Sequence, residues 1–167
     1  MKKIIILLSL ALSCALMNAQ PVITQKDRDR AASLVSQMTL KEKCLLVGGQ
    51  VDGFHTAAIE RLGIPSVRMA DGPQGVRNKT NSTYYPCGLA LAASWNRDIA
   101  ASVGRGIGTD ASERGVSIML CPGVNIYRYP LCGRNFEYMG EDPYLASETA
   151  LEYIGGIQSK GIIATIK

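Results

Sequence analysis

The chain has 167 residues, of which 47% are hydrophobic and 19% are charged, and these proportions are typical of one globular domain rather than a disordered chain. The formal net charge is only +4, and Lys2 and Lys3 supply two of those charges. No basic stripe with interleaved aromatic residues occurs in the sequence. We therefore expect no nucleic-acid partner.

The first residues have the pattern of an export signal. Lys2 and Lys3 precede an apolar run at residues 4–12, and uncharged residues follow as far as Ala19. The run is too short to cross a bilayer as a stable helix. The pattern predicts a signal peptide at residues 1–19, a periplasmic or secreted location and no membrane span. A lipid anchor at Cys14 is the less favoured alternative.

The cysteines and the single histidine form no catalytic or metal-binding pattern. After the signal the chain has four cysteines without zinc-type spacing, namely Cys44, Cys87, Cys121 and Cys132. Export permits disulfides and no spacing selects a pairing, so buried free thiols are the favoured interpretation. The sequence contains no nucleophile-elbow motif that could use His55, and a single histidine excludes a two-histidine metal site within this chain. We expect no metal and no cofactor.

Helical patterns begin the mature chain. Apolar residues recur at helical spacing over residues 27–38. Thr39 and Glu42 form a capping box that predicts a second helix over about residues 40–47. One further helical turn is expected at residues 57–62. These helices are expected to pack on the main domain.

Three apolar runs are typical of buried strands, and helical segments separate them. The first run ends at Asp71, and the others cover residues 116–120 and 162–166. Helices are predicted over residues 98–115 and 143–158. This alternation indicates a parallel α/β architecture with right-handed crossovers. The chain ends inside an apolar run, so we expect an amino-terminal piece of a larger protein.

A glycine series in the predicted helix at 98–115 superficially resembles a phosphate-binding loop. Gly104, Gly106 and Gly108 neither follow a strand nor open a helix, so the nucleotide-binding fingerprint fails. Close packing against another helix is the better interpretation. An anion-binding or nucleotide-binding protein is accordingly disfavoured.

Charged residues follow the ends of the predicted strands. Asp71 and Arg77 flank the loop after the first strand, Arg134 lies after the second, and Lys167 ends the third. Because the carboxyl ends of parallel strands meet at one face, we expect one acid and three cations to converge there. Such a cluster suits the hydroxyls of a small polar ligand, although charge alone leaves sugar and phosphate open. An ordinary Asp-Gly turn is the alternative for the first loop.

Several motifs occur together and in a fixed order. They are Met-Thr-Leu-Lys-Glu-Lys at 38–43, Asp-Gly-Pro-Gln-Gly-Val-Arg at 71–77, Pro-Leu-Cys-Gly-Arg-Asn-Phe-Glu-Tyr at 130–138 and Gly-Ile-Ile-Ala-Thr-Ile-Lys at 161–167. This set resembles glycoside hydrolase family 3, the β-glucosidase and β-xylosidase group. The resemblance implies an incomplete (β/α)8 TIM-type barrel at residues 20–167, with about the first three parallel strands and their helices.

The same resemblance implies a function. It identifies Asp71, Arg77, Arg134 and Lys167 as ligands of the terminal sugar of an oligosaccharide or β-glycoside. It implies an exo-acting retaining β-glycosidase whose nucleophile and acid/base lie on later strands, so this chain alone is expected to hold no catalytic residue and to be inactive. A non-catalytic carbohydrate-binding or interaction protein that uses the same face is the alternative.

Three residues near these motifs carry further expectations. Gln74 is expected to be dispensable for turnover. Glu137 is left without a role, and Glu141 is assigned to the loop before the helix. Two departures from the family pattern are Gly140, where serine is usual, and Cys121, where glycine is usual; neither removes a sugar ligand.

Overall fold

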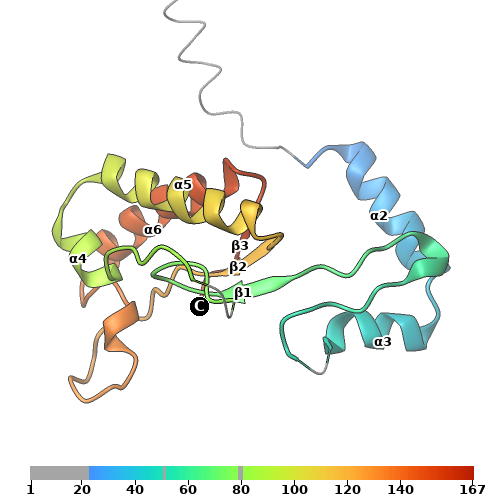
Figure 1. Cartoon of the computed structure of the whole chain (residues 1–167), viewed down its shortest axis with the longest axis horizontal. Coiled ribbons are helices and arrows are strands. Elements are labelled where there is room, and N and C mark those ends of the chain that lie inside the picture. The colour runs from blue at the N-terminus through green and yellow to red at the C-terminus, as the bar shows by residue number, and fades with distance from the viewer. Residues whose placement is uncertain (1–22, 51, 79–80) are drawn as a thin grey trace, which may run out of the picture.

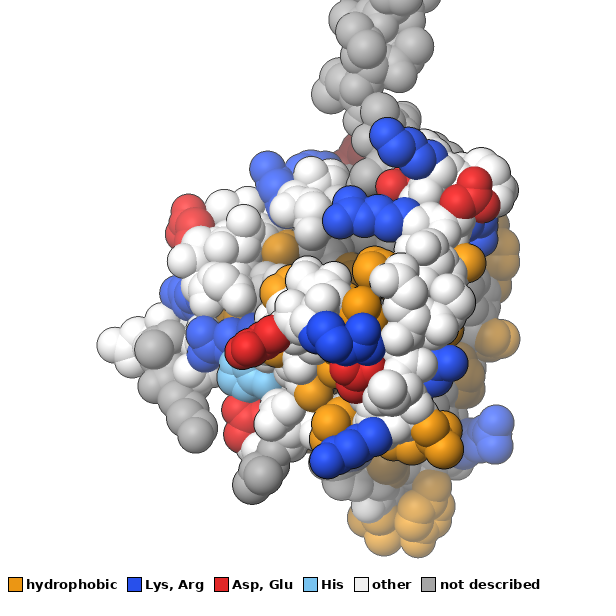
Figure 2. Space-filling view, turned by 90° about the vertical axis from the view of Figure 1, so that its right-hand side faces the viewer, with side chains coloured by type: hydrophobic (Ala, Val, Ile, Leu, Met, Phe, Trp, Pro, Cys, Tyr) orange, Lys and Arg blue, Asp and Glu red, His pale blue; other side chains and the backbone are white. Residues whose placement is uncertain are grey.

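The computed structural model describes residues 23–50, 52–78 and 81–167. The predicted signal peptide and the alternative anchor at Cys14 lie outside the described residues. Within them, no helix is both long and apolar enough to cross a membrane. Acidic and basic side chains are interspersed on the face of the molecule that Figure 2 shows.

Three short parallel strands form the sheet, as the sequence predicts. They are β1 (Met69–Asp71), β2 (Ile118–Leu120) and β3 (Ile163–Ala164), in the order β1-β2-β3. Ala70 and Met119 are register partners, and Met119 pairs in turn with Ala164. All three carboxyl ends therefore lie at the same edge of the sheet. Each strand is shorter than its apolar run, because the runs include residues that only flank the ladder.

Helices α5 (Arg97–Glu113) and α6 (Pro143–Gln158) lie side by side over one face of this sheet (Figure 1). The bounds of α6 match the prediction, and Asp142 caps it by accepting a hydrogen bond from the Tyr144 amide at 2.8 Å. The core between the helices and the sheet consists of apolar and aromatic side chains, among them Ile107, Met119, Tyr153 and Ile157. Ile99 lies at helical spacing from the buried residues Val103 and Ile107 of α5 but is 45% exposed.

The glycines of α5 permit a very close approach to α6. A Cβ atom on Gly104 would lie 2.2 Å from the carbonyl oxygen of Tyr153, and one on Gly156 would lie 2.4 Å from that of Ala101. Neither position has room for a side chain without separation of the helices. Close helix packing therefore explains Gly104 and Gly108, whereas Gly106 lies against the side chain of Tyr85. A short helix that was not predicted, α4 (Gly88–Ala93), precedes α5.

The amino-terminal helices stand apart from the sheet (Figure 1). No residue within α2 (Gln25–Gln37) or α3 (Leu40–Gly48) is buried, so the expectation that they pack on the main domain is wrong for the described residues. The capping box of α3 is confirmed, because Thr39 and Glu42 bond reciprocally. Arg61, in the 3₁₀ turn η1 (Glu60–Leu62), donates to the Glu42 carboxylate at 2.8 Å. This bond and the cap lower the pKa of Glu42 to about 2.

The four cysteines of the described residues are free thiols. Only Cys121 is fully buried, and burial raises the pKa of its thiol to about 12. Cys44 and Cys132 are exposed, so the expectation of buried thiols is wrong for these two.

Candidate functional site

The loop after β1 folds back on itself at the carboxyl end of the sheet. The amide of Arg77 donates to the carbonyl oxygen of Asp71 at 2.9 Å, so the two ends of the loop are paired. Gly72 has a φ of 149°, and a Cβ atom there would lie 1.6 Å from the carbonyl oxygen of Gly75. Only glycine fits at this position. The closed loop brings the Arg77 guanidinium to 3.5 Å from the Asp71 carboxylate.

Lys167 reaches the same carboxylate from the end of β3. Its amide donates to the Pro122 carbonyl at 3.1 Å, and its carbonyl accepts from the Val124 amide at 2.8 Å. These two bonds fix the backbone of Lys167 beside the segment that follows β2. Its ammonium nitrogen lies 2.5 Å from Oδ1 of Asp71.

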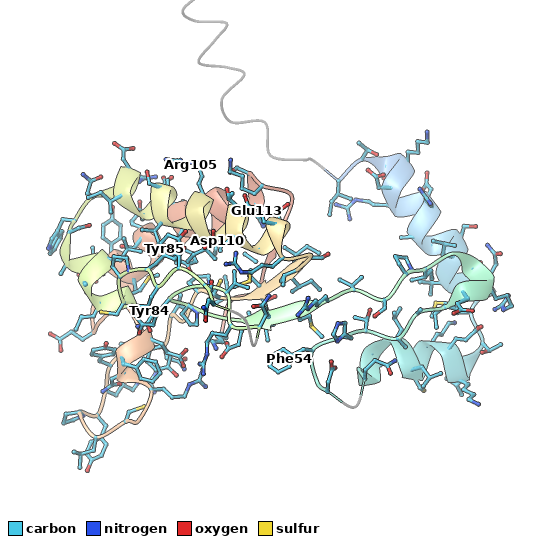
Figure 3. All side chains as sticks on the ribbon, viewed as in Figure 1. Phe54, Tyr84, Tyr85, Arg105, Asp110 and Glu113 are labelled. Carbon is cyan, nitrogen blue, oxygen red and sulfur yellow. The ribbon has the colours of Figure 1, made fainter. Side chains whose placement is uncertain are left out.

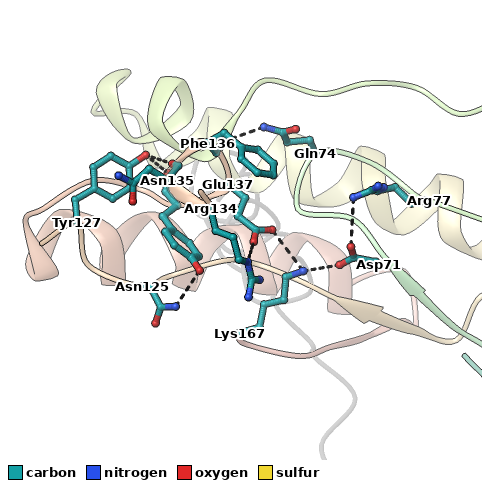
Figure 4. A network of polar contacts seen from close by, with 11 residues as sticks. Asp71, Gln74, Arg77, Asn125, Tyr127, Arg134, Asn135, Phe136, Glu137 and Lys167 are labelled. Atoms are coloured by element: carbon teal, nitrogen blue, oxygen red, sulfur yellow. Dashed lines mark hydrogen bonds and ion pairs between the residues drawn. The ribbon is translucent and has the colours of Figure 1, made fainter. Parts of the chain in front are cut away.

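Arg134 joins the cluster through a second carboxylate (Figure 4). The 3₁₀ turn η2 (Asn135–Glu137) follows Arg134 in the loop after β2. Nε of Arg134 donates to Glu137, whose other oxygen lies 3.4 Å from Nζ of Lys167. The hydrogen bond and negative charge of Glu137 raise the pKa of Arg134. The Arg134 guanidinium also lies 5.7 Å from the centre of the Tyr138 ring, within cation–π range.

The structure thus brings together all four residues that the sequence placed at the site. One chain of ion pairs runs from Arg77 through Asp71, Lys167 and Glu137 to Arg134. The cluster holds two carboxylates rather than the single acid expected. Glu137 was the residue missed, although its spacing of three from Arg134 is that of side chains on one face of a helical turn.

A cavity of about 840 Å³ opens beside this network. Asp71, Arg77 and Glu137 contribute to its wall, whereas Arg134 and Lys167 do not. Aromatic side chains from different loops, including Phe54 and Tyr84, also line it (Figure 3). The cavity therefore combines charged hydrogen-bonding groups with apolar ring surfaces, a combination suited to a polar ligand that also has apolar faces.

Two tethers hold the loop after β1 in place. The buried Gln74 donates to the carbonyl oxygen of Phe136 at 3.2 Å and accepts a hydrogen bond from the Tyr84 hydroxyl. The buried Tyr153 of α6 donates to the carbonyl oxygen of Pro73 at 2.9 Å. Gln74 therefore has a structural role, which counts against the expectation that it is dispensable.

The other titratable groups that the structure describes form no metal centre. Among the described residues, no group of three or more His, Cys, Asp or Glu side chains is arranged to hold a metal ion. His55 bonds through Nδ1 to Asp52 at 2.6 Å. Tyr85 donates to Asp110 at 3.2 Å, which fixes the segment before α4 against α5 (Figure 3).

These features define an α/β protein whose parallel strands present a polar ligand site at their carboxyl ends. The chain belongs to glycosyl hydrolase family 3, because the model of the family's N-terminal domain matches residues 37–167.

Curated relatives agree with this assignment. The chain is 47% identical over 146 residues to thermostable beta-glucosidase B of Acetivibrio thermocellus, a match that covers 80% of this chain and 19% of the relative. It is 45% identical over 157 residues to beta-glucosidase BoGH3A of Bacteroides ovatus, covering 86% of this chain and 21% of that protein. The chain therefore spans about a fifth of the length of these relatives.

Solved structures confirm the expected barrel architecture. Beta-glucosidase 3B from Thermotoga neapolitana in complex with glucose matches with a TM-score of 0.75 and 38% identity, over 83% of this chain and 22% of that one. Beta-D-glucoside glucohydrolase from Trichoderma reesei matches with a TM-score of 0.78 and 32% identity, over 88% of this chain and 22% of that one. The three strands and their helices correspond to the amino-terminal part of such a barrel.

Proposed function

We propose that this chain is the amino-terminal part of an exo-acting retaining β-glycosidase of the β-glucosidase or β-xylosidase type. The full-length protein removes the terminal sugar from an oligosaccharide or β-glycoside. Residues 20–167 supply the first part of the barrel and one wall of the sugar pocket. The signal pattern at residues 1–19 supports export to the periplasm or the medium.

The ion-paired network is the observation that carries this proposal. Asp71 offers carboxylate oxygens as acceptors, and the guanidinium groups of Arg77 and Arg134 offer donors that face solvent, with side chains 73% and 55% exposed. Donors and acceptors fixed side by side match the neighbouring hydroxyls of a pyranose ring. Two carboxylates against three cations leave one net positive charge, so the proposal of a sugar rests on the paired donors and acceptors and not on the net charge.

The same pairing supports a binding role rather than a catalytic role for this chain. A retaining glycosidase needs two carboxyl groups about 5–5.5 Å apart, one as nucleophile and one as acid/base. Asp71 is held by Lys167 and Arg77, and Glu137 is held by Arg134 and Lys167. We assign the nucleophile and the acid/base to the protein beyond residue 167, and we expect the isolated chain to be inactive.

The test uses the full-length protein and aryl β-glucosides and β-xylosides. We expect hydrolysis with the first-formed sugar in the β configuration, which proton NMR of the fresh product measures. Asp71→Asn should lower kcat/KM by roughly 10- to 150-fold, because a hydrogen bond to a charged group contributes about 1.5–3 kcal/mol. Glu141→Gln is the control, since Glu141 is exposed on the loop before α6.

Two results would contradict the proposal. One is a full-length protein that releases no sugar from any β-glycoside, which would favour a non-catalytic carbohydrate-binding role. The other is Asp71→Asn with the kcat/KM of the wild type.

A further inference from the structure

Glu137 is the one charged side chain that is buried among the described residues, with 5% of its surface exposed. A carboxylate removed from water needs charged or hydrogen-bonding partners, because desolvation strongly disfavours an isolated charge. Each oxygen of Glu137 has one such partner: Nε of Arg134 and Nζ of Lys167. These partners come from different parts of the barrel wall, one from the loop after β2 and one from the end of β3.

The backbone of Glu137 is fixed independently of those ion pairs. Its carbonyl oxygen lies against Gly88 and Gly123. A Cβ atom added to Gly88 would lie 3.0 Å from this oxygen, and one added to Gly123 would lie 2.9 Å from it. The preceding carbonyl, that of Phe136, accepts the hydrogen bond from Gln74. Glu137 therefore extends from a packed turn, and its carboxylate is a fixed point between the two cationic side chains.

The pairing leaves the outer donors of both cations available. Glu137 occupies Nε of Arg134, and the Tyr138 ring lies against the guanidinium, so the terminal nitrogens form no hydrogen bond within the described residues. Nζ of Lys167 has three N–H groups, and its partners among the described residues are Asp71 and Glu137. One N–H group remains for a ligand.

We propose that Glu137 is a positioning residue that sets the orientation of Arg134 and Lys167 toward the substrate. This inference rests on the proposed function in one respect, namely that these two cations bind the sugar. Glu137 contributes through them: it neutralises their mutual repulsion and fixes which of their N–H groups face the ligand.

The kinetic test compares Glu137→Gln with Glu141→Gln in the full-length protein. Both variants replace a carboxylate by its amide in the same loop, but Glu141 is exposed. We expect Glu137→Gln to lower kcat/KM by about 100-fold, the effect of a displacement of roughly 1 Å at binding groups. Glu141→Gln should retain the wild-type value.

A double-mutant cycle separates positioning from simple structural support. If Glu137 contributes through Arg134, then Glu137→Gln should reduce kcat/KM far less in an Arg134→Met background than in the wild type. Equal fold-changes in the two backgrounds would overturn the proposal. Should Glu137→Gln not fold, Glu137→Asp replaces it in the same cycle, because the shorter side chain withdraws the carboxylate from both cations.

Crystal structures of the wild type and Glu137→Gln give a measurement that does not depend on activity. We expect the side chains of Arg134 and Lys167 to leave their wild-type positions in the variant. Unchanged positions would overturn the positioning role even if the protein proved not to be a glycosidase. The side chains could also move in the variant while the wild-type protein shows no glycosidase activity. That result would refute the proposed function and retain the positioning role.

Discussion

Substitution of Gly104 by alanine tests the packing that supports the site. The new Cβ atom would lie 2.2 Å from the carbonyl oxygen of Tyr153, whereas ordinary contact begins at 3.4 Å, so α5 and α6 must separate by about 1.2 Å. Overpacking of a core costs about 1–3 kcal/mol, and a clash with backbone belongs at the upper end of that range. Alanine recovers about 1 kcal/mol through its higher helix propensity. The net destabilisation is therefore about 2 kcal/mol.

Calorimetry of the full-length protein measures this effect. A destabilisation of about 2 kcal/mol lowers the Tm of a domain of 150–250 residues by roughly 4–8 °C, and we expect a smaller decrease in the larger barrel of the full-length protein. Gly48→Ala is the control, because Gly48 is also helical and a Cβ atom there would meet nothing within 4 Å. An unchanged Tm in Gly104→Ala, or an equal loss in Gly48→Ala, would refute the reasoning. Since Tyr153 also donates to Pro73, we expect Gly104→Ala to lower kcat/KM as well.

Two further predictions concern titration and thiol reactivity. The pKa of Glu42 is about 2 against an ordinary 4.5, so its pairing with Arg61 stabilises the fold above pH 4.5 and is lost as pH falls toward 2. The Tm difference between wild type and Glu42→Gln should therefore disappear across that interval, and a constant difference would contradict it. Because the pKa of Cys121 is about 12, a thiol reagent at about pH 8 should modify Cys44 and Cys132 in the folded protein but Cys121 only after unfolding.

Local signals account for the elements that the sequence predicted well. Asp142 and Pro143 are a cap and a first-turn proline, and they fix the start of α6. Thr39 and Glu42 do the same for α3. Helix α4 lacks a side-chain cap and has only six residues, so its sequence carries no comparable signal.

Longer-range packing accounts for what the sequence did not show. The backbone carbonyl of Glu137 packs against Gly88 and Gly123, which precede it by 49 and 14 residues in the chain. Ile99 has helical spacing with the buried residues of α5, but Ala100 occupies the core position beside it. The sequence led us to expect that α2 and α3 pack on the main domain, because apolar residues at helical spacing indicate a face that prefers burial. The same spacing does not identify which part of the protein covers that face.

The closed loop at residues 71–77 has a consequence for protein engineering. Tyr153 of α6 bonds to the carbonyl oxygen of Pro73, Gln74 bonds to that of Phe136 in η2, and Gly72 has no room for a side chain. A library of variants at residues 71–77 would therefore mainly yield misfolded proteins. Phe54, which lines the cavity with 41% of its surface exposed, is under weaker constraint than Tyr84, whose hydroxyl holds the loop through Gln74. Attempts to change which ligand the cavity accepts should therefore randomise Phe54 and leave the loop at residues 71–77 unaltered.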